Sequence, residues 1–568
     1  MVHIKKTLII PIALLIITAN TIVVYSPIIN NGFIAMDDSY YVTDNEMIKD
    51  LSVENFFDFF HTKVAGNIQP LTMLSLSLDY HFFKLTPSAY HIHNVLLHII
   101  NAILVFIFIY VLSNRKLFLA FLTSLLFAIH PLHVESVAWI SERKDVLYSL
   151  YYIAGLITYL LYKKKDNSNF LVFTYVLFVL SLFSKPTAVS FPIVLVILDF
   201  YLEGKFKLKQ FTSKILLFGL SLIFGLINLK AQGVTSVAHH DFAIYQKIIY
   251  SSYNIIFYIR SFFLPLNLSM FHDTPSTIPF YYYVYTIFTL GLVVFTFYSI
   301  VKKKKKILIF GLLFFVSTIF LTLHIVAFSR AIVAERYTYV PYIGVAFSFL
   351  FIVFYKKDGT FKHILNKPYL TWFLSFVVIA LFSIMSYSYI KNDWKNSGTL
   401  WTNSIKYCPK SKTSYDARSN YYLLGGMPEK AIFDIKKSLS YNTNDSYTNL
   451  SLAYYYYYIN KYDSVFIVSD KKKNNTMYKG EFTKLRAMTY FKEEKYKLAS
   501  LCYDSLISNK PNNYKFRYER AKVNTKLNLF PKVIEDLSVC LSLKPDSVHI
   551  KNELKVAYSK LNKKAISF

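Results

Sequence analysis

Long apolar segments fill the first two thirds of the chain and restrict what it can fold into. Eleven of these segments are long enough to span a membrane. A twelfth apolar stretch, 248–265, carries Arg260 and ends at Pro265, so we expect it to lie in the membrane interface or to form a re-entrant segment. With 54% hydrophobic and 17% charged residues, the composition is one that soluble domains seldom have. The sequence therefore predicts an all-α, polytopic membrane domain of eleven or twelve spans. The eleven segments of spanning length lie near residues 7–29, 93–113, 116–132, 143–162, 169–185, 187–203, 214–231, 280–301, 307–327, 334–355 and 369–390.

Basic clusters in the short loops mark one side of this domain. The positive-inside rule assigns such clusters to the cytoplasm. The first apolar segment has no small-residue cleavage site, which predicts a retained signal anchor. Eleven crossings then put the N-terminus in the cytoplasm and the C-terminal tail outside it. The clusters are Lys5 and Lys6; Arg115 and Lys116; Lys163, Lys164 and Lys165; Lys205, Lys207 and Lys209; Lys302 to Lys306; and Lys356 and Lys357.

The net charge of +29 does not indicate a nucleic-acid-binding protein. Loop lysines and a lysine-rich tail account for it, and such a tail is attracted to anionic lipid headgroups. We therefore expect membrane lipids, and no nucleic acid, among the partners. The three cysteines, Cys408, Cys502 and Cys540, lack disulfide or metal spacing, so they predict neither a disulfide framework nor a metal site.

Ionisable residues at membrane depth are costly and are functional candidates by default. Under the predicted topology a group of them shares the non-cytoplasmic face, whereas the opposite loops hold little besides lysine. This group consists of Asp37, Asp38, His130, His133, Glu135, Lys185, Arg330, Glu335 and Arg336.

Asp37 and Asp38 follow the first span directly. A solvated turn carries such a pair as well, but the other polar groups of this face favour a chemical role. A carboxylate at the lipid–water boundary has its pKa adjusted by desolvation, which suits a general base. We predict that one of the two deprotonates an acceptor hydroxyl while a lipid-linked sugar phosphate leaves.

The stretch from His130 to Glu135 holds two histidines and a glutamate within six residues. Its spacing is not the helical His-Glu-x-x-His pattern, and Pro131 interrupts a helix there. We therefore predict no metal ligands, leave a divalent cation open as a cofactor, and keep His130, His133 and Glu135 as candidates for substrate binding.

Four cations are candidates for holding a phosphate: Arg143, Lys144, Lys185 and Arg336. Snorkelling to the interface is the alternative for the first three. For Glu335 and Arg336 the alternative is an internal ion pair between helices.

Past residue 390 no further spanning segment occurs, and a period of 34 residues appears. Small residues recur in two tracks, and prolines mark a third phase at Pro409, Pro511 and Pro545. The period matches tetratricopeptide (TPR) repeats, whose helix pairs form a groove for peptides or partner proteins. We thus expect a membrane domain at 1–390 and a TPR solenoid at 391–568. The tracks are Ser419, Ala453, Ala487 and Ala521, and Ala431, Val465, Ala499 and Val533.

Together these features resemble a known family. The motifs MDDSYYVTDN, AGNIQPLTMLSLSLDYHFF, HIHNVLLHIINAILVF, FAIHPLHVESVAWISERKDVL, LFSKPTAVSFPIVLVILDF and VAERYTYVPYIG are similar to those of the transmembrane-and-TPR (TMTC-type) O-mannosyltransferases of the GT-C glycosyltransferase superfamily. One departure is Met36, where relatives usually carry a tryptophan before the acidic pair.

The resemblance implies an inverting enzyme that moves a sugar, mannose in this family, from a polyprenyl-phosphate carrier to protein Ser or Thr outside the cytoplasm. It also implies that Asp37 or Asp38 is the base, and that the repeats bind the polypeptide acceptor. The composition, rich in Lys, Asn and Ile, indicates a low-GC bacterium, and hence an inner-membrane protein with a periplasmic tail. Two alternatives remain open: a non-catalytic TPR scaffold for an envelope complex, and a lipid-carrier transporter.

Overall fold

The computed structural model describes residues 6–232, 242–275, 277–302, 305–324, 331–356, 358–471, 477–545 and 547–566. Arg330, together with Lys5, Lys303, Lys304 and Lys357 of the basic clusters, lies outside these residues. Within them every regular element is a helix, which confirms the all-α prediction. The chain divides into two compact units, Met1–Ser411 and Lys412–Phe568.

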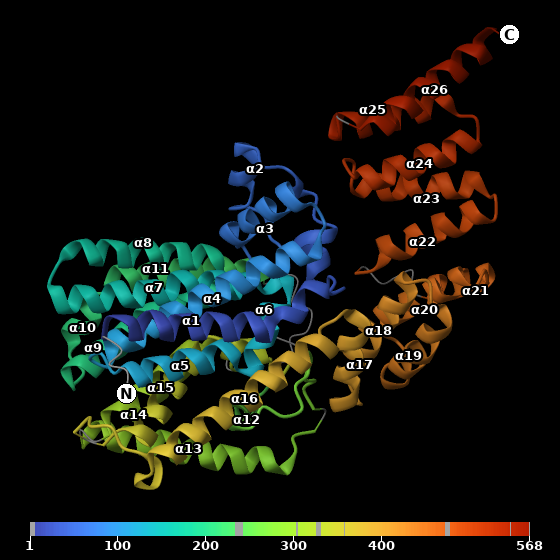
Figure 1. The fold of residues 1–568 in the computed structure, drawn as a ribbon. Helices are drawn as coiled ribbons and strands as arrows, with labels where there is room; N and C mark the ends of the chain where they lie inside the picture. Colours follow the sequence, from blue (N-terminus) through green and yellow to red (C-terminus); the bar gives the residue numbers. More distant parts are fainter. Residues whose placement is uncertain are drawn as a thin grey trace. The chain divides into compact units, whose positions relative to one another are not determined.

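The first unit is a bundle of long apolar helices (Figure 1). Seven described helices are long and apolar enough to cross a membrane, and an eighth span results if a pair of helices bent by 53° counts as one. The other three expected segments form shorter apolar helices, so each of the eleven segments is helical, and the number of full crossings stays a prediction. The bundle helices are α1 (Lys6–Tyr25), α4 (Pro87–Leu112), α5 (Leu117–Ile129), α7 (Arg143–Lys165), α8 (Ser168–Ser184), α9 (Phe191–Glu203), α11 (Ile215–Gln232), α13 (Phe280–Val301), α14 (Lys306–Ile319), α15 (Pro341–Phe354) and α16 (Pro368–Asn392).

The three shorter helices are α8, α14 and α15. The twelfth segment forms α12 (Ile244–Phe263), which is not among the candidate spans, in keeping with the expectation that 248–265 makes no simple crossing.

Prolines end several helices at the same end of the bundle. The residue before a proline disfavours the α conformation, and both His130 (ψ 129°) and Lys185 (ψ 135°) are extended there. After His130 the chain makes a turn, Pro131–His133, and a short helix, α6 (Val134–Ala138), before α7 begins. These breaks place polar side chains beside one another without continuing the apolar helices.

Lysine clusters meet at the opposite end of the bundle. Lys163 lies 3.3 Å from the Glu203 carboxylate, Lys116 donates a hydrogen bond to the Gly359 carbonyl (2.6 Å), and Lys306 donates one to the Leu202 carbonyl (3.4 Å). Helix α7 runs from the polar end at Arg143 to this end at Lys165, about 33 Å at the usual helical rise. That length matches the hydrocarbon thickness of a bilayer.

The segment between α1 and α4 folds onto the polar end of the bundle. It contains α2 (Val53–Asp58) and α3 (Pro70–Phe83). Its buried Tyr41, Ile48 and Met73 pack in one cluster with Ile140, just ahead of α7. This small core fixes the backbone around Asp37 and Asp38.

The second unit repeats helix pairs (Figure 1). Its first helix, α18, starts at Lys412. The preceding helix, α17 (Ser397–Tyr407), belongs to the first unit, because it is hydrogen-bonded to it. Asn403 donates to the Leu268 carbonyl (2.9 Å), and Ser397 Oγ accepts from the Ala35 N–H (2.7 Å). The division therefore falls later than residue 390. The helices are α18 (Lys412–Leu424), α19 (Pro428–Tyr441), α20 (Ser446–Tyr458), α21 (Tyr462–Lys471), α22 (Lys479–Lys492), α23 (Tyr496–Asn509), α24 (Tyr514–Lys526), α25 (Phe530–Leu543) and α26 (Val548–Ile566).

Both small-residue tracks of the 34-residue period are buried along their whole length, with no member more than 3% exposed. Each pair, α18 with α19, α20 with α21, α22 with α23, and α24 with α25, packs closely. Small residues at these positions let the paired helices approach, which is the arrangement expected of TPR units.

Helices α14 and α15 cross closely at Gly311 and Gly344. A Cβ atom added to Gly311 would lie 2.5 Å from the Gly344 carbonyl oxygen, whereas one added to Gly291 on α13 would meet nothing within 4 Å. We expect Gly311→Ala to destabilise the detergent-solubilised protein by about 1–3 kcal/mol, because the helices must separate. Thermal unfolding checks this, with Gly291→Ala as the matched control; equal melting temperatures for the two variants would contradict the close crossing.

Candidate functional site

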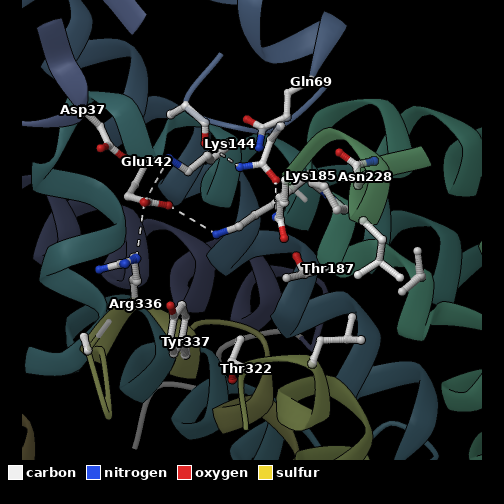
Figure 2. Close-up of a pocket in the computed structure, with 18 of the residues that line it drawn as sticks. Asp37, Gln69, Glu142, Lys144, Lys185, Thr187, Asn228, Thr322, Arg336 and Tyr337 are labelled. Carbon is white, nitrogen blue, oxygen red and sulfur yellow. Dashed lines mark hydrogen bonds and ion pairs between the residues drawn. The ribbon is translucent and has the colours of Figure 1, made fainter. Parts of the chain in front are cut away.

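A cavity of about 500 Å³ opens at the polar end of the first unit (Figure 2). Its size is that of a small-molecule site. One wall is charged and another is apolar, with Leu229, Met270, Phe271, Leu321 and Leu323. Its polar lining consists of Asp37, Tyr41, Asn67, Gln69, Glu142, Lys144, Lys185, Thr187, Asn228, Gln232, Thr322, His324, Arg336 and Tyr337.

Glu142 is the centre of the charged wall (Figure 2). Its side chain is 2% exposed, and its two carboxylate oxygens contact three cations. Lys144 Nζ lies 3.1 Å away, Lys185 Nζ 3.3 Å and Arg336 Nε 3.4 Å. One buried carboxylate thus gathers cations from the start of α7, the end of α8 and the segment before α15.

Each of these cations is held by a further partner. Lys185 also pairs with the buried carboxylate of Asp145. The guanidinium of Arg336 pairs with Glu135, whose other oxygen accepts the Arg336 backbone N–H at 2.9 Å. The Lys144 ammonium lies 4.6 Å from the centre of the Tyr41 ring, at cation–π distance. The three positive groups are therefore preorganised at the cavity wall.

The two adjacent aspartates have different surroundings. Asp37 lines the cavity with 27% of its side chain exposed, and its Oδ2 lies 3.8 Å from Lys144 Nζ. Asp38 is buried: its carboxylate accepts hydrogen bonds from the backbone N–H groups of Ile34 (2.8 Å) and Ser141 (2.9 Å) and from the Ser141 hydroxyl. Only Asp37 is open to a bound substrate.

Burial raises the pKa of Asp38 to about 6, although the hydrogen bonds from Ser141 and Ile34 oppose the rise. Its contacts join the segment after α1 to the segment before α7. Asp38 therefore acts as a structural tie that positions Asp37.

Five of the predicted binding residues do not line the cavity: Arg143, His130, His133, Glu335 and also Glu135, which is fully buried and pairs with Arg336 from behind the cavity wall. Arg143 is 1% exposed and turns toward α3 and α4, where it pairs with Asp79 (2.7 Å) and donates to the Tyr90 carbonyl (3.0 Å). The rings of His130 and His133 pack among aromatic side chains, and each ring bonds a backbone carbonyl, that of Phe262 or Phe127. These contacts are structural, and they leave Arg143 and the two histidines without access to a ligand in the cavity.

Glu335 is the fourth. Its carboxylate accepts the Ser269 N–H (2.6 Å) and the Tyr389 hydroxyl (3.2 Å), and burial raises its pKa to about 7. It is therefore not the ion-pair partner of the neighbouring Arg336, whose carboxylate partners are Glu135 and Glu142.

Sequence reasoning missed the two residues that organise the charged wall, Glu142 and Asp145. Both stand in the SERKDVL motif, one on each side of Arg143 and Lys144, and an acid next to a base in sequence is typical of a local surface pair. Asn228 of the cavity lies in none of the motifs, and Gln69 lies in the motif AGNIQPLTMLSLSLDYHFF but was not a predicted site residue. Within the described ranges no group of three or more His, Cys, Asp or Glu side chains is arranged to hold a metal ion.

Comparison with known proteins confirms the resemblance to the TMTC type. The chain is 30% identical to human protein O-mannosyl-transferase TMTC3 over 148 residues, which are 24% of this chain and 16% of that protein. It is 25% identical to the Caenorhabditis elegans protein O-mannosyl-transferase F38B6.6 over 432 residues, 70% of this chain and 58% of that one. Mouse protein O-mannosyl-transferase TMTC1 is 38% identical over 96 residues, 16% of this chain and 10% of that one.

In each case the match spans less than two thirds of the relative's own length. No protein-family model matches the chain.

The central position of Glu142 leads to a stability prediction. Glu142→Gln removes the shared counter-charge of three cations, of which Lys144 is buried and Lys185 and Arg336 are partly buried, and removing one partner of a buried ion pair typically costs about 3–5 kcal/mol. Asp37→Asn, which alters a half-open carboxylate with one long contact, should change stability by less than about 1 kcal/mol. Thermal or denaturant unfolding in detergent measures both; a Glu142→Gln variant as stable as Asp37→Asn would show that the cations do not depend on this carboxylate.

Proposed function

We propose that the chain is an integral membrane glycosyltransferase that moves a sugar from a polyprenyl-phosphate carrier to a Ser or Thr hydroxyl of a protein. One observation carries the proposal: the cavity presents an open carboxylate, Asp37, beside three cations gathered on Glu142. Support also comes from relatives that are named protein O-mannosyl-transferases, which makes mannose the proposed sugar.

The carboxylate of the cavity acts on the acceptor hydroxyl, and its cations act on the phosphate of the donor. Asp37 accepts the proton of the acceptor hydroxyl while the oxygen of that hydroxyl attacks the anomeric carbon of the donor sugar. The bond between that carbon and the phosphate oxygen breaks, and the bonding electron pair leaves with the polyprenyl phosphate. Attack from the face opposite the leaving group inverts the anomeric configuration.

The phosphate gains negative charge as it leaves, and fixed cations lower the energy of that state. Lys144, Lys185 and Arg336 supply them, already oriented by Glu142, Asp145 and Glu135. The apolar wall accommodates the start of the prenyl chain, and α11 beside it exposes Leu222 and Leu226 for contact with lipid.

The proposed orientation follows the basic clusters. The lysine end of the bundle faces the cytoplasm, and the cavity faces the other compartment, the periplasm if the host is a bacterium. The repeats of the second unit would bind the polypeptide acceptor there, as solenoids of paired helices do.

Replacing Asp37 tests the chemistry. Purified protein is incubated with labelled undecaprenyl- or dolichyl-phosphate mannose and a panel of Ser/Thr peptides, and labelled peptide is counted. We expect Asp37→Asn to lower transfer by about 10²–10⁴-fold, the usual contribution of a general base, while donor binding persists.

Asp44→Asn is the control, because Asp44 is an exposed carboxylate of the same segment and does not line the cavity. Wild-type transfer by Asp37→Asn would defeat the assignment of the base. Carrier movement across vesicles without any sugar transfer by the wild type would instead identify a transporter.

A further inference from the structure

A second cavity, of about 340 Å³, lies at the lysine end of the first unit. It sits where the end of α7, the end of α9, the short α10 (Leu208–Thr212) and the start of α11 converge, at the left of the bundle in Figure 1. It shares no lining residue with the cavity that holds Asp37. The proposed transfer reaction therefore makes no use of it.

Positive charge exceeds negative charge in its lining. Two carboxylates, Asp199 and Glu203, face four lysines: Lys163, Lys207, Lys209 and Lys214. Asp199 is 3% exposed and already has Lys214 at 2.6 Å and Lys163 at 3.2 Å. Glu203 has Lys207 at 2.6 Å and Lys163 at 3.3 Å. Two positive charges are left without a matching carboxylate in the lining.

Lys209 is the lining lysine that is available to bind an anion. Within the described part of the chain no carboxylate lies at ion-pair distance from it, although it lines the cavity. Polar donors surround the same space, among them the Ser213 hydroxyl and the phenol groups of Tyr162 and Tyr175. Ammonium and hydroxyl donors around one small space are the groups that hold a phosphate.

Exposed apolar side chains neighbour the lining lysines in sequence, which indicates where the phosphate comes from. Between and after the lysines of this segment, Phe206 is 40% exposed, Leu208 79%, Phe211 43% and Ile215 73%. Alternation of exposed lysine with exposed apolar side chains is typical of a segment lying in the membrane interface. An acyl chain packed on these side chains would bring its headgroup close to Lys207 and Lys209, which line the cavity.

We propose that this cavity binds the phosphate headgroup of an anionic lipid from the leaflet at the lysine end, with Lys209 as a direct ligand. Basic pockets between membrane helices recognise anionic headgroups in this way. The site is separate from the transfer reaction, so its occupancy is measured by lipid binding and not by sugar transfer.

The test is saturation binding of a fluorescent short-chain phosphatidylglycerol to the full-length protein in neutral detergent. Lys209→Ala removes a charge-assisted hydrogen bond, so we expect the dissociation constant to rise by about tenfold or more. Lys205→Ala is the matched control: Lys205 is exposed in the same segment but does not line the cavity. We expect a much smaller change for it, and unchanged melting temperatures for both variants.

Equal weakening by the two variants would indicate general surface attraction and overturn the proposal, as would no weakening by Lys209→Ala. Phosphatidylcholine with the same chains should compete poorly. Inorganic phosphate that displaces the probe as well as unlabelled phosphatidylglycerol does would assign the cavity to a soluble anion and overturn the lipid source.

Discussion

The polar end of this membrane domain depends on one buried carboxylate. Lys144, Lys185 and Arg336 are like charges that repel one another, and a low-dielectric surrounding strengthens that repulsion. Glu142 contacts all three within 3.4 Å, and Asp145 and Glu135 add a second partner each for Lys185 and Arg336. Because the cations are fixed before any ligand arrives, a bound phosphate would meet them without reorganising the wall.

Helix breaks bring these groups together. His130 and Lys185 are extended because prolines follow them, so the chain stops being helical where polar side chains are needed. The segment after α1 is fastened there by Asp38, whose carboxylate bonds Ile34 and Ser141 and leaves its neighbour Asp37 facing the cavity. About 33 Å of helix α7 then separates this end from the lysine clusters, where the second cavity lies.

Sequence patterns predicted the helical class, the repeat period and four of the charged residues that line the cavity. They could not separate Arg143 from Lys144, because successive residues of a helix point about 100° apart and only the fold shows which neighbour each meets. For the same reason the sequence did not reveal the role of Glu142, and it did not show which of Asp37 and Asp38 faces the cavity. Apolar runs predicted where the helices lie, but apolar length alone does not distinguish a full crossing from the short helices α8, α14 and α15, so the number of spans stays a prediction.

The most direct test of the account is an experimental structure with a non-hydrolysable polyprenyl-phosphonate sugar bound. Our account predicts the phosphonate against the side chains of Lys144, Lys185 and Arg336, with the sugar's anomeric carbon on the side of Asp37. A phosphonate bound elsewhere, with the cavity of Asp37 unfilled, would contradict it.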